Sequence, residues 1–399
     1  MKNEPLTEIV AADDRAIRVV DETIAMAAGV RASDIHFEPL TTRLRVRCRV
    51  DGALRETASH PKDLEGAVIS RAKLIAGISI AERRLPQDGR IAVTHDGRRL
   101  DLRVSTVPTV HGESVVMRIL DRANVRVGLD ELGLFPDDLA ALEQLVNLPD
   151  GLVLVTGPTG SGKTTTLYSC LQHLNRSDRK IITVEDPVEY SLPGINQVAV
   201  KPEAGMTFAA ALRAMLRQAP NVIMVGEIRD RETAEIAIHA ALTGHLVLST
   251  LHTNDAPSAV VRLRDLGIKP FLIAASLRGV VAQRLARRIC AACATAVEAD
   301  AGARRLLEAE TTQPDLMGLR WGRGCPACDG TGYRGRLGLY ELFVINEAQR
   351  GLIHEEADRD RLRAAIPGWR SMRQDGVRKV IAGLTTAEEV VCMTSGEVS

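Results

Sequence analysis

The feature that most constrains this chain is a glycine-rich loop at residues 157–164, which reads Gly-Pro-Thr-Gly-Ser-Gly-Lys-Thr. The apolar run 152–155 precedes the loop, and residues 165–171 follow it with the apolar spacing of a helix. In such a setting the backbone N–H groups of the loop converge on phosphate oxygens, and the helix N-terminus favours bound anions. We expect Lys163 to reach the β- and γ-phosphates and the Thr164 hydroxyl to coordinate Mg²⁺.

A chance glycine-rich turn is the ordinary alternative, but it requires neither a strand before it nor a helix after it. The sequence therefore predicts that the chain binds a nucleoside triphosphate together with Mg²⁺. The residues predicted to bind the phosphates are Gly157, Pro158, Thr159, Gly160, Ser161, Gly162, Lys163, Thr164 and Thr165.

Composition narrows the class of protein. A chain of 399 residues is long enough for two or three domains. Its 51 basic and 51 acidic residues cancel, so the net charge gives no indication of a nucleic acid or of an acidic surface as partner. The sequence lacks an apolar run of the roughly 18–20 residues that a membrane span needs. Residues 1–5 also lack the apolar stretch of a signal peptide, so we expect a cytoplasmic protein.

Four of the seven cysteines form two Cys-x-x-Cys pairs, Cys290 with Cys293 and Cys325 with Cys328. Four thiolates in one short region suit tetrahedral Zn²⁺, and the glycines around the second pair favour the tight turns of such a site. A redox-active pair is the main alternative, but it needs only one Cys-x-x-Cys motif. Disulfides are disfavoured in a reducing cytosol. The four cysteines are therefore predicted to be ligands of a structural zinc ion.

Hydrophobic patterns divide the chain into two parts. In the first part, apolar spacing predicts a helix over 16–28 and a second helix over 62–76. Alternating strand patterns surround the second helix, with turn signals at 51–52 and 95–97. Helices mixed with antiparallel hairpins predict a compact α+β domain over residues 1–124.

After an expected linker at 125–134, short apolar strands alternate with helical stretches through a second domain, residues 135–399. This rhythm predicts an α/β fold with a parallel sheet and crossover helices. The zinc-binding subdomain is expected at about 284–340, and a helical C-terminus at 341–399. The predicted strands are 152–156, 181–185, 222–226 and 246–250.

Polar residues follow three of these strands, where ligands of open α/β sheets bind. Glu185 ends one strand and Glu227 follows the next, and a carboxylate there can orient or deprotonate the attacking water while Lys163 offsets phosphoryl charge. A solvated acidic turn would explain either glutamate alone, but two on successive strands favour a site. We expect Glu227 to activate water, with Glu185 as the second candidate. His252 is expected to contact the γ-phosphate, although a lone histidine is more often structural.

Together these segments resemble the motifs of the secretion-ATPase superfamily, in the family's order. The matching Walker A, Asp box, Walker B and His box are residues 153–164, 185–190, 224–230 and 242–255. Residues 32–39, 84–90 and 104–113 of the N-terminal part resemble the same family, and the last of these favours its type II secretion ATPases, the general secretion pathway protein E group. The cysteine pairs fit that group and the type IV pilus extension ATPases, but disfavour the retraction ATPases. The resemblance covers roughly residues 15–395.

The resemblance implies a homo-hexameric, Mg²⁺-dependent ATPase that powers pseudopilus assembly. Such a protein is peripheral on the cytoplasmic side of the inner membrane, where it works with membrane platform proteins of the secretion system. ATP would lie between the N-terminal domain and a RecA-like P-loop NTPase domain, where arginines complete the site and stabilise phosphoryl charge. By motif position these arginines are Arg103 and Arg118 of the N-terminal domain and Arg213, Arg217, Arg229 and Arg262 of the RecA-like domain.

One departure from the family pattern concerns recruitment. The family usually carries a further N-terminal domain that docks on the inner-membrane partner, whereas only about fifteen residues precede the first expected helix. We therefore expect either a short member of the family or a truncated chain. From the residues alone, Arg103 occupies an ordinary outward position on a strand.

Two alternative functions remain at this stage. One is extension of type IV pili, against which the 104–113 segment leans. The other is a nucleic-acid translocase, because RecA-like cores and zinc ribbons also occur in that class. Its binding would need basic grooves and stacking aromatic residues, and the chain is neutral with 3% aromatic residues. No nucleic-acid partner is therefore expected.

Overall fold

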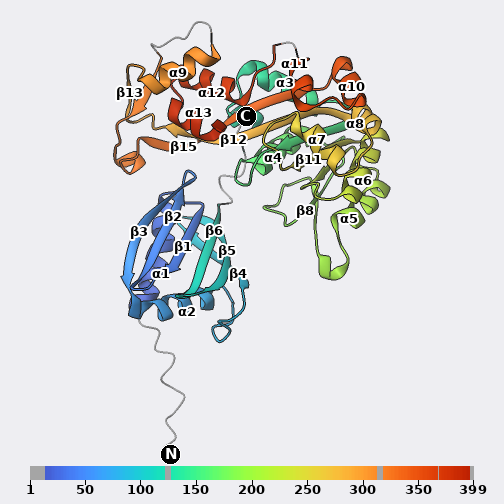
Figure 1. Cartoon of the computed structure of the whole chain (residues 1–399). Coiled ribbons are helices and arrows are strands. Elements are labelled where there is room, and N and C mark those ends of the chain that lie inside the picture. Colours follow the sequence, from blue (N-terminus) through green and yellow to red (C-terminus); the bar gives the residue numbers. More distant parts are fainter. Residues whose placement is uncertain (1–13, 122–126, 312–317, 367, 396–399) are drawn as a thin grey trace, which may run out of the picture. The chain divides into compact units, whose positions relative to one another are not determined.

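The computed structural model describes residues 14–121, 127–311, 318–366 and 368–395 of the chain (Figure 1). The chain forms two compact units, which divide between Val125 and Arg126. The first unit encloses one hydrophobic core, whereas the second has a core on each face of a larger sheet. Within the described residues, every helix is too short or too polar to cross a bilayer.

The first unit is built on a six-stranded antiparallel sheet with the strand order β3-β2-β1-β6-β5-β4. Its strands are β1 (Asp34–Pro39), β2 (Arg43–Val50), β3 (Ala53–Pro61), β4 (Gln87–His95), β5 (Arg98–Thr109) and β6 (Gly112–Asp121). Leu44, Val46 and Cys48 alternate onto one face, where they are fully buried. On that face they form a core with residues of helices α1 (Asp14–Gly29) and α2 (Glu65–Ile75).

Tight turns close two hairpins of this sheet at the places that the sequence predicts. Asp51 and Gly52 join β2 to β3 with φ angles of 49° and 86°, and Asp96 and Gly97 join β4 to β5 with 48° and 74°. Two residues in the left-handed region match the twist of an antiparallel pair, which is why Asp-Gly is favoured there. A short 3₁₀ turn, η1 (Lys62–Leu64), leads into α2, so the helix predicted between the hairpins is confirmed.

The second unit is built on a seven-stranded sheet with the order β15-β12-β7-β11-β10-β8-β9, in which β15 alone is antiparallel to its neighbour. The four predicted strands are confirmed as β7 (Gly151–Thr156), β8 (Ile181–Glu185), β10 (Val222–Val225) and β11 (Leu246–Leu251). The other sheet strands are β9 (Asn196–Ala199), β12 (Leu277–Ile289) and β15 (Tyr333–Val344). β12 and β15 extend across both ends of the range expected for the zinc-binding subdomain, whose boundaries stay a prediction.

Helices of the second unit lie before, between and after these strands along the chain. They are α3 (Pro136–Val146), α4 (Lys163–Leu174), α5 (Phe208–Met215), α6 (Arg231–Leu242), α7 (Ser258–Asp265), α8 (Pro270–Ser276), α9 (Ala301–Glu310), α10 (Glu347–His354), α11 (Arg359–Ala364), α12 (Met372–Ile381) and α13 (Ala387–Thr394). Short 3₁₀ turns are η3 (Leu129–Leu132), η4 (Pro202–Ala204), η5 (Leu216–Gln218) and η6 (Pro326–Cys328). A two-stranded ribbon pairs β13 (Ala294–Ala296) with β14 (Arg320–Gly322).

Helices cover both faces of the seven-stranded sheet. Leu152 and Leu154 of β7 join a core with α5, α6, α7 and α8, whereas Val153 and Val155 join another core with α3 and α4. Because the central strands are buried on both faces, they are continuous apolar runs in the sequence. The loops that follow parallel strands meet at one edge of the sheet, and this edge carries the glycine-rich loop after β7, Glu227 after β10 and His252 after β11.

Candidate nucleotide site and cysteine cluster

The glycine-rich loop joins β7 to α4, as predicted. β7 ends at Thr156 and α4 begins at Lys163, so the loop presents the N-terminus of a helix whose dipole favours anions. Gly162 caps the helix with a φ of 89°, a left-handed conformation that glycine adopts without strain. A Cβ added at Gly157 would lie 2.3 Å from the carbonyl oxygen of Gln283, so the loop backbone approaches β12 closely. Thr164 is exposed in the first turn of α4, which suits a role at Mg²⁺.

Lys163 lies against the loop that precedes it. Its ammonium group donates hydrogen bonds to the carbonyl oxygens of Gly157, at 2.8 Å, and Pro158, at 2.9 Å. Burial lowers the pKa of Lys163 below its usual value, although the negative charge of Glu227 acts in the opposite direction. Lys163 therefore lies within the electrostatic reach of the predicted catalytic carboxylate.

Glu227 contacts two of the other predicted site residues, Arg229 and His252. It follows β10, which is parallel to both β8 and β11, so its side chain lies at the carboxyl edge of the sheet. One carboxylate oxygen pairs with Arg229, and the other lies 3.5 Å from Nε2 of His252, just beyond β11. The Glu227 side chain is 15% exposed, whereas His252 is 52% exposed. A partly buried carboxylate beside a lysine and an accessible histidine can act on a water molecule at a bound phosphate.

Glu185 lies in a different environment from Glu227. It is buried at the end of β8, where it accepts hydrogen bonds from the hydroxyl groups of Tyr168 and Thr183 and from the side-chain amide of Gln197. The Thr183 bond is 2.5 Å long and the Gln197 bond is 3.1 Å long. Burial, and next the hydrogen bond to Glu185, raise the pKa of Tyr168. Because both carboxylate oxygens have neutral donors, the geometry favours Glu227 for the activation of water.

The four arginines predicted on the RecA side differ in position. Arg229 reaches Glu227, as described above. Arg213 pairs with Glu232 of α6, and Arg217 donates to the carbonyl oxygen of Arg213 at 3.0 Å. Arg262 is exposed on α7. Within the second unit, the structure thus brings one of the four into contact with the central carboxylate.

The two arginines predicted in the first unit are direct neighbours across strands. Arg103 of β5 faces Arg118 of β6 in the sheet register, and Arg90 of β4 faces Arg103 on the other side. Arg118 donates a hydrogen bond of 3.1 Å to Asp34 and remains 61% exposed. Three arginines therefore form one row across the sheet, which we call the arginine row. Their role toward a nucleotide stays a prediction.

The four predicted metal ligands, Cys290, Cys293, Cys325 and Cys328, form one cluster. Their sulfur atoms all lie within 4.8 Å of one another. The Sγ–Sγ distances are 3.9 Å for 290 to 325, 3.9 Å for 293 to 328 and 3.7 Å for 325 to 328. Tetrahedral Zn–S bonds of about 2.3 Å place neighbouring sulfur atoms about 3.8 Å apart. The residues present therefore fit a zinc ion held by four thiolates.

Backbone N–H groups support this donor set. The N–H groups of Cys325 and Gly332 donate to Sγ of Cys328 at 3.2 and 3.3 Å. Burial raises the pKa of the Cys328 thiol, but these backbone bonds and the contacts with the Cys325 and Cys293 side chains together lower it to about 6. Gly324 and Gly330, with φ of 89° and 73°, make the tight turns that the sequence predicted around the second pair.

One residue that contacts the nucleotide loop was not predicted from the sequence: Gln283, which is buried in β12. Its side-chain amide donates to the carbonyl oxygen of Ser161 at 2.8 Å and accepts from the hydroxyl group of Thr166 at 2.7 Å. The sequence feature that could have indicated it is the single glutamine after the apolar run 280–282, because a polar side chain inside a buried strand needs hydrogen-bond partners.

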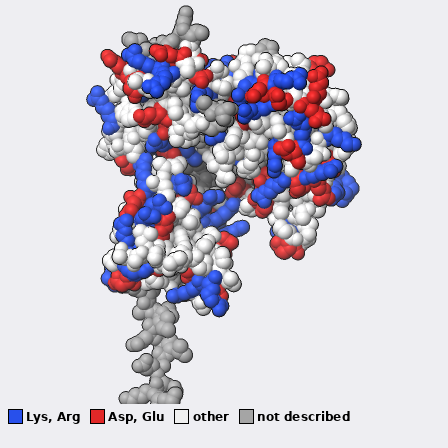
Figure 2. All heavy atoms as spheres, in the orientation of Figure 1, with Lys and Arg blue, Asp and Glu red and all other residues white. Residues whose placement is uncertain are grey.

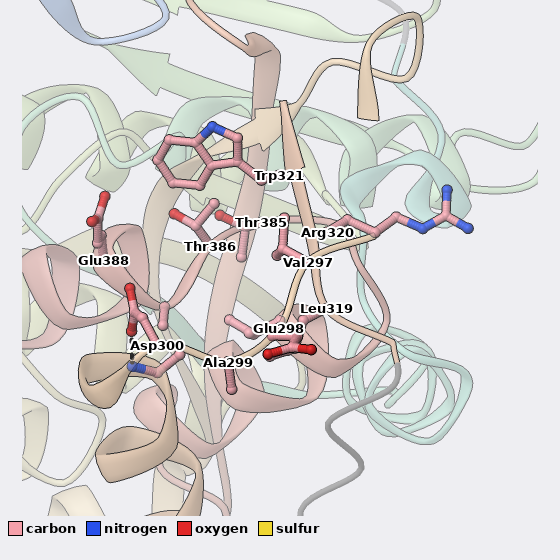
Figure 3. A pocket seen from close by; sticks show the side chains of 13 residues that line it. Val297, Glu298, Ala299, Asp300, Leu319, Arg320, Trp321, Thr385, Thr386 and Glu388 are labelled. Atoms are coloured by element: carbon pink, nitrogen blue, oxygen red, sulfur yellow. Dashed lines mark hydrogen bonds between the residues drawn. The ribbon is translucent and has the colours of Figure 1, made fainter. Parts of the chain in front are cut away.

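A separate pocket, open to solvent, lies between the β13–β14 ribbon and helices α9 and α13 (Figure 3). Trp321 forms one wall, and Asp300 and Glu388 bring carboxylates to another. Asp300 caps α9 by accepting from the N–H of Ala303, and Glu388 lies in the first turn of α13. Both carboxylates therefore have a structural explanation at a helix N-terminus.

Comparisons with known sequences agree with one another. A family model described as type II/IV secretion system protein matches residues 10–392. Type II secretion system protein HxcR of Pseudomonas aeruginosa is 53% identical over 393 residues, a match that covers 98% of this chain and 80% of that protein. Type II secretion system ATPase E of Vibrio cholerae is 49% identical over 398 residues, covering 98% and 78%. Type IV pilus assembly ATPase PilB of Myxococcus xanthus is 48% identical over 392 residues, covering 96% and 69%.

Solved structures share the architecture. The crystal structure of the pilus retraction motor PilT with bound ADP matches with a TM-score of 0.62 and 29% identity, over 93% of this chain and 96% of that chain. The ATPase DotB of Legionella pneumophila matches in fold, with a TM-score of 0.66 and 22% identity over 99% of this chain and 98% of that chain.

Proposed function

This chain belongs to the family of type II/IV secretion system proteins, and we propose that it is the ATPase that powers pseudopilus assembly and protein export in a type II secretion system. The family resemblance inferred from the sequence motifs is confirmed by these comparisons. The observation that carries the proposed chemistry is the position of Glu227 at the carboxyl edge of the sheet, 3.5 Å from His252 and close enough for its charge to act on Lys163.

In the proposed reaction, Lys163 moves from the loop carbonyls to the β- and γ-phosphates of ATP, where its positive charge stabilises the transferring phosphoryl group. Glu227 orients the attacking water and accepts its proton, while His252 contacts the γ-phosphate. The Thr164 hydroxyl would hold Mg²⁺, which supplies further charge neutralisation when bound. In this scheme Glu185 does not act on water; its hydrogen bonds to Thr183 and Gln197 hold the end of β8 in place.

The cysteine cluster is proposed to hold one structural Zn²⁺, since its sulfur spacing fits four thiolate ligands. The protein is further proposed to act as a homo-hexamer on the cytoplasmic side of the inner membrane, together with platform proteins of the secretion system. In that assembly Arg103 and Arg118 complete the nucleotide site, and Arg213, Arg217 and Arg262 line its RecA side. This part of the proposal rests on the family resemblance.

A hydrolysis assay on the purified chain tests the proposed activity. Lys163→Ala is expected to abolish nucleotide binding, because the phosphate charge loses its nearest cation. Glu227→Gln is expected to bind ATP normally and to lower turnover by at least about 100-fold, because the amide cannot accept a proton. Glu235→Gln, a change at a partly exposed residue of α6 that pairs with Arg231 and lies outside the proposed site, is the matched control and is expected to keep full activity. Normal turnover in Glu227→Gln would contradict this assignment.

Extension of type IV pili is the second candidate, favoured by the 48% identity with the pilus assembly ATPase. Deletion of the gene in its host separates the two functions. Lost protein export with intact pili supports the type II assignment, whereas lost pili with normal export supports the pilus function.

A further inference from the structure

Gln283 has a polar side chain at a buried position, where a polar group loses its hydrogen bonds to water. It follows the buried residues Val280, Val281 and Ala282 in β12 and is itself 2% exposed. An amide removed from water at such a site destabilises the fold unless its donor and acceptor both find partners. The partners of this amide are therefore informative about why a glutamine occupies the position.

Both partners of the amide belong to the nucleotide loop and the helix that follows it. The carbonyl oxygen of Ser161 can only accept, which identifies the group 2.8 Å away as the NH₂ of Gln283. The oxygen of the amide then faces the hydroxyl group of Thr166, which donates at 2.7 Å. One side chain of β12 thus joins the last turn of the loop to the first turn of α4.

Close backbone packing reinforces this junction. A Cβ added at Gly162 would lie 2.7 Å from the side-chain nitrogen of Gln283. One added at Gly157 would lie 2.3 Å from the backbone carbonyl oxygen of Gln283. Gly157 and Gly162 are therefore needed for the approach to β12, in addition to the turns they make.

The bond to Ser161 has a consequence for phosphate recognition. In a trans peptide the C=O of one residue and the N–H of the next point in opposite directions. Gln283 holds the carbonyl of Ser161 toward β12, so it directs the N–H of Gly162 away from the strand. That N–H belongs to the set that a phosphate loop turns toward its ligand.

We propose that Gln283 is a positioning residue of the nucleotide site, which aims the loop N–H groups at the phosphates of ATP by holding the Ser161 carbonyl. The inference rests on the proposed binding of ATP at this loop. Gln283 touches no reacting atom in this scheme and acts through the loop.

The test compares nucleotide affinity and stability in variants of the full chain. Gln283→Met keeps the volume and removes both hydrogen bonds, and it is expected to weaken ATP binding about tenfold in a calorimetric titration. The control is Gln349→Met in α10, where a fully buried glutamine donates to the carbonyl oxygen of Ala365 at 2.9 Å. Both variants lower the melting temperature, but the control keeps the wild-type affinity.

A second variant gives a pH signature and serves where Gln283→Met does not fold. In Gln283→Glu the ionised carboxylate repels the Ser161 carbonyl, whereas the protonated form donates a hydrogen bond to it. ATP affinity relative to wild type at the same pH is therefore expected to recover as the pH falls from 8 to 5.5. Wild-type affinity in Gln283→Met, an equal loss in Gln349→Met, or a flat pH profile in Gln283→Glu would overturn the inference. Failure of the wild-type protein to bind ATP would instead overturn the proposed function.

Discussion

At the scale of single residues, Glu227 differs from Glu185 in the partners of its carboxylate. Cationic or titratable groups, Arg229 and His252, meet Glu227, whereas neutral hydroxyl and amide donors meet Glu185. A carboxylate that faces movable charged groups can change its contacts during a reaction. One enclosed by three neutral donors in a buried strand end is better suited to hold the strand in place.

The contact between His252 and Glu227 gives a prediction at this scale. His252→Ala is expected to lower turnover about tenfold and to change ATP affinity less than twofold, because the ring lies beside Glu227, the proposed catalytic carboxylate. The measurement is a steady-state ATPase assay with a parallel binding titration. His239→Ala, an exposed change on α6, is the control and should match wild type. A purely structural His252 would give a lower melting temperature with unchanged turnover.

Sequence motifs predicted Lys163, Glu227 and His252 because each follows a recognisable strand end. Gln283 could not be predicted because its hydrogen-bond partners, Thr166 and Ser161, lie 117 and 122 residues away in the chain. Only the pairing of β12 with β7 brings it under the loop. Local patterns in the sequence predict individual strands, but they do not predict which strands pair with each other in the sheet.

At the scale of elements, β12 and β15 form the most extensive strand pair of the second unit, and the cysteine cluster closes one end of it. β12 ends at Ile289, directly before Cys290, and β15 begins at Tyr333, shortly after Cys328. The cysteines could be predicted from the sequence but this strand pair could not, because arginines interrupt the apolar pattern of its strands. The central strands were easier to predict since burial on both faces makes them continuously apolar.

Zinc removal gives a prediction for these elements. Cys325→Ser is expected to lose the metal and to lower the melting temperature by about 5–10 °C, because an incomplete cluster no longer holds the strand ends together. Elemental analysis of protein purified without chelator and thermal unfolding are the measurements. Cys392→Ser, an exposed change, should keep one zinc per chain. Absence of zinc from the wild-type protein would contradict the assignment of the cluster.

At the scale of the whole molecule, charge is distributed less evenly than composition suggests. The net charge is +0, and Figure 2 shows basic and acidic side chains interspersed over the face in view. The arginine row of the first unit is nevertheless a local concentration of cations across three strands. A sum over the chain cannot reveal such a row, because it depends on strand register.

The arginine row leads to a prediction about assembly. If Arg103 and Arg118 complete the nucleotide site in the assembled protein, Arg103→Ala and Arg118→Ala lower turnover at least about tenfold at concentrations where the protein is hexameric. Activity per chain in the wild-type protein should rise with oligomerisation. Light scattering coupled to an ATPase assay over a concentration series measures both. Arg18→Ala, on the exposed side of α1, is the control, and equal activity in all three variants would remove the row from the mechanism.

The strand that carries Gln283 leads directly into Cys290, so the cysteine cluster can influence the register of this strand. A slip of one residue between β12 and its neighbours would turn every side chain of the strand to the opposite face. Gln283 would then leave Ser161 and Thr166, although each strand remained intact. The irregularity in the β12–β15 register between Arg287 and Ile289, and the four cysteines beyond it, make such a slip costly. With a metal bound, the four cysteines would hold this register and so preserve the alignment of the nucleotide loop, which Gln283 contacts from the middle of the same strand.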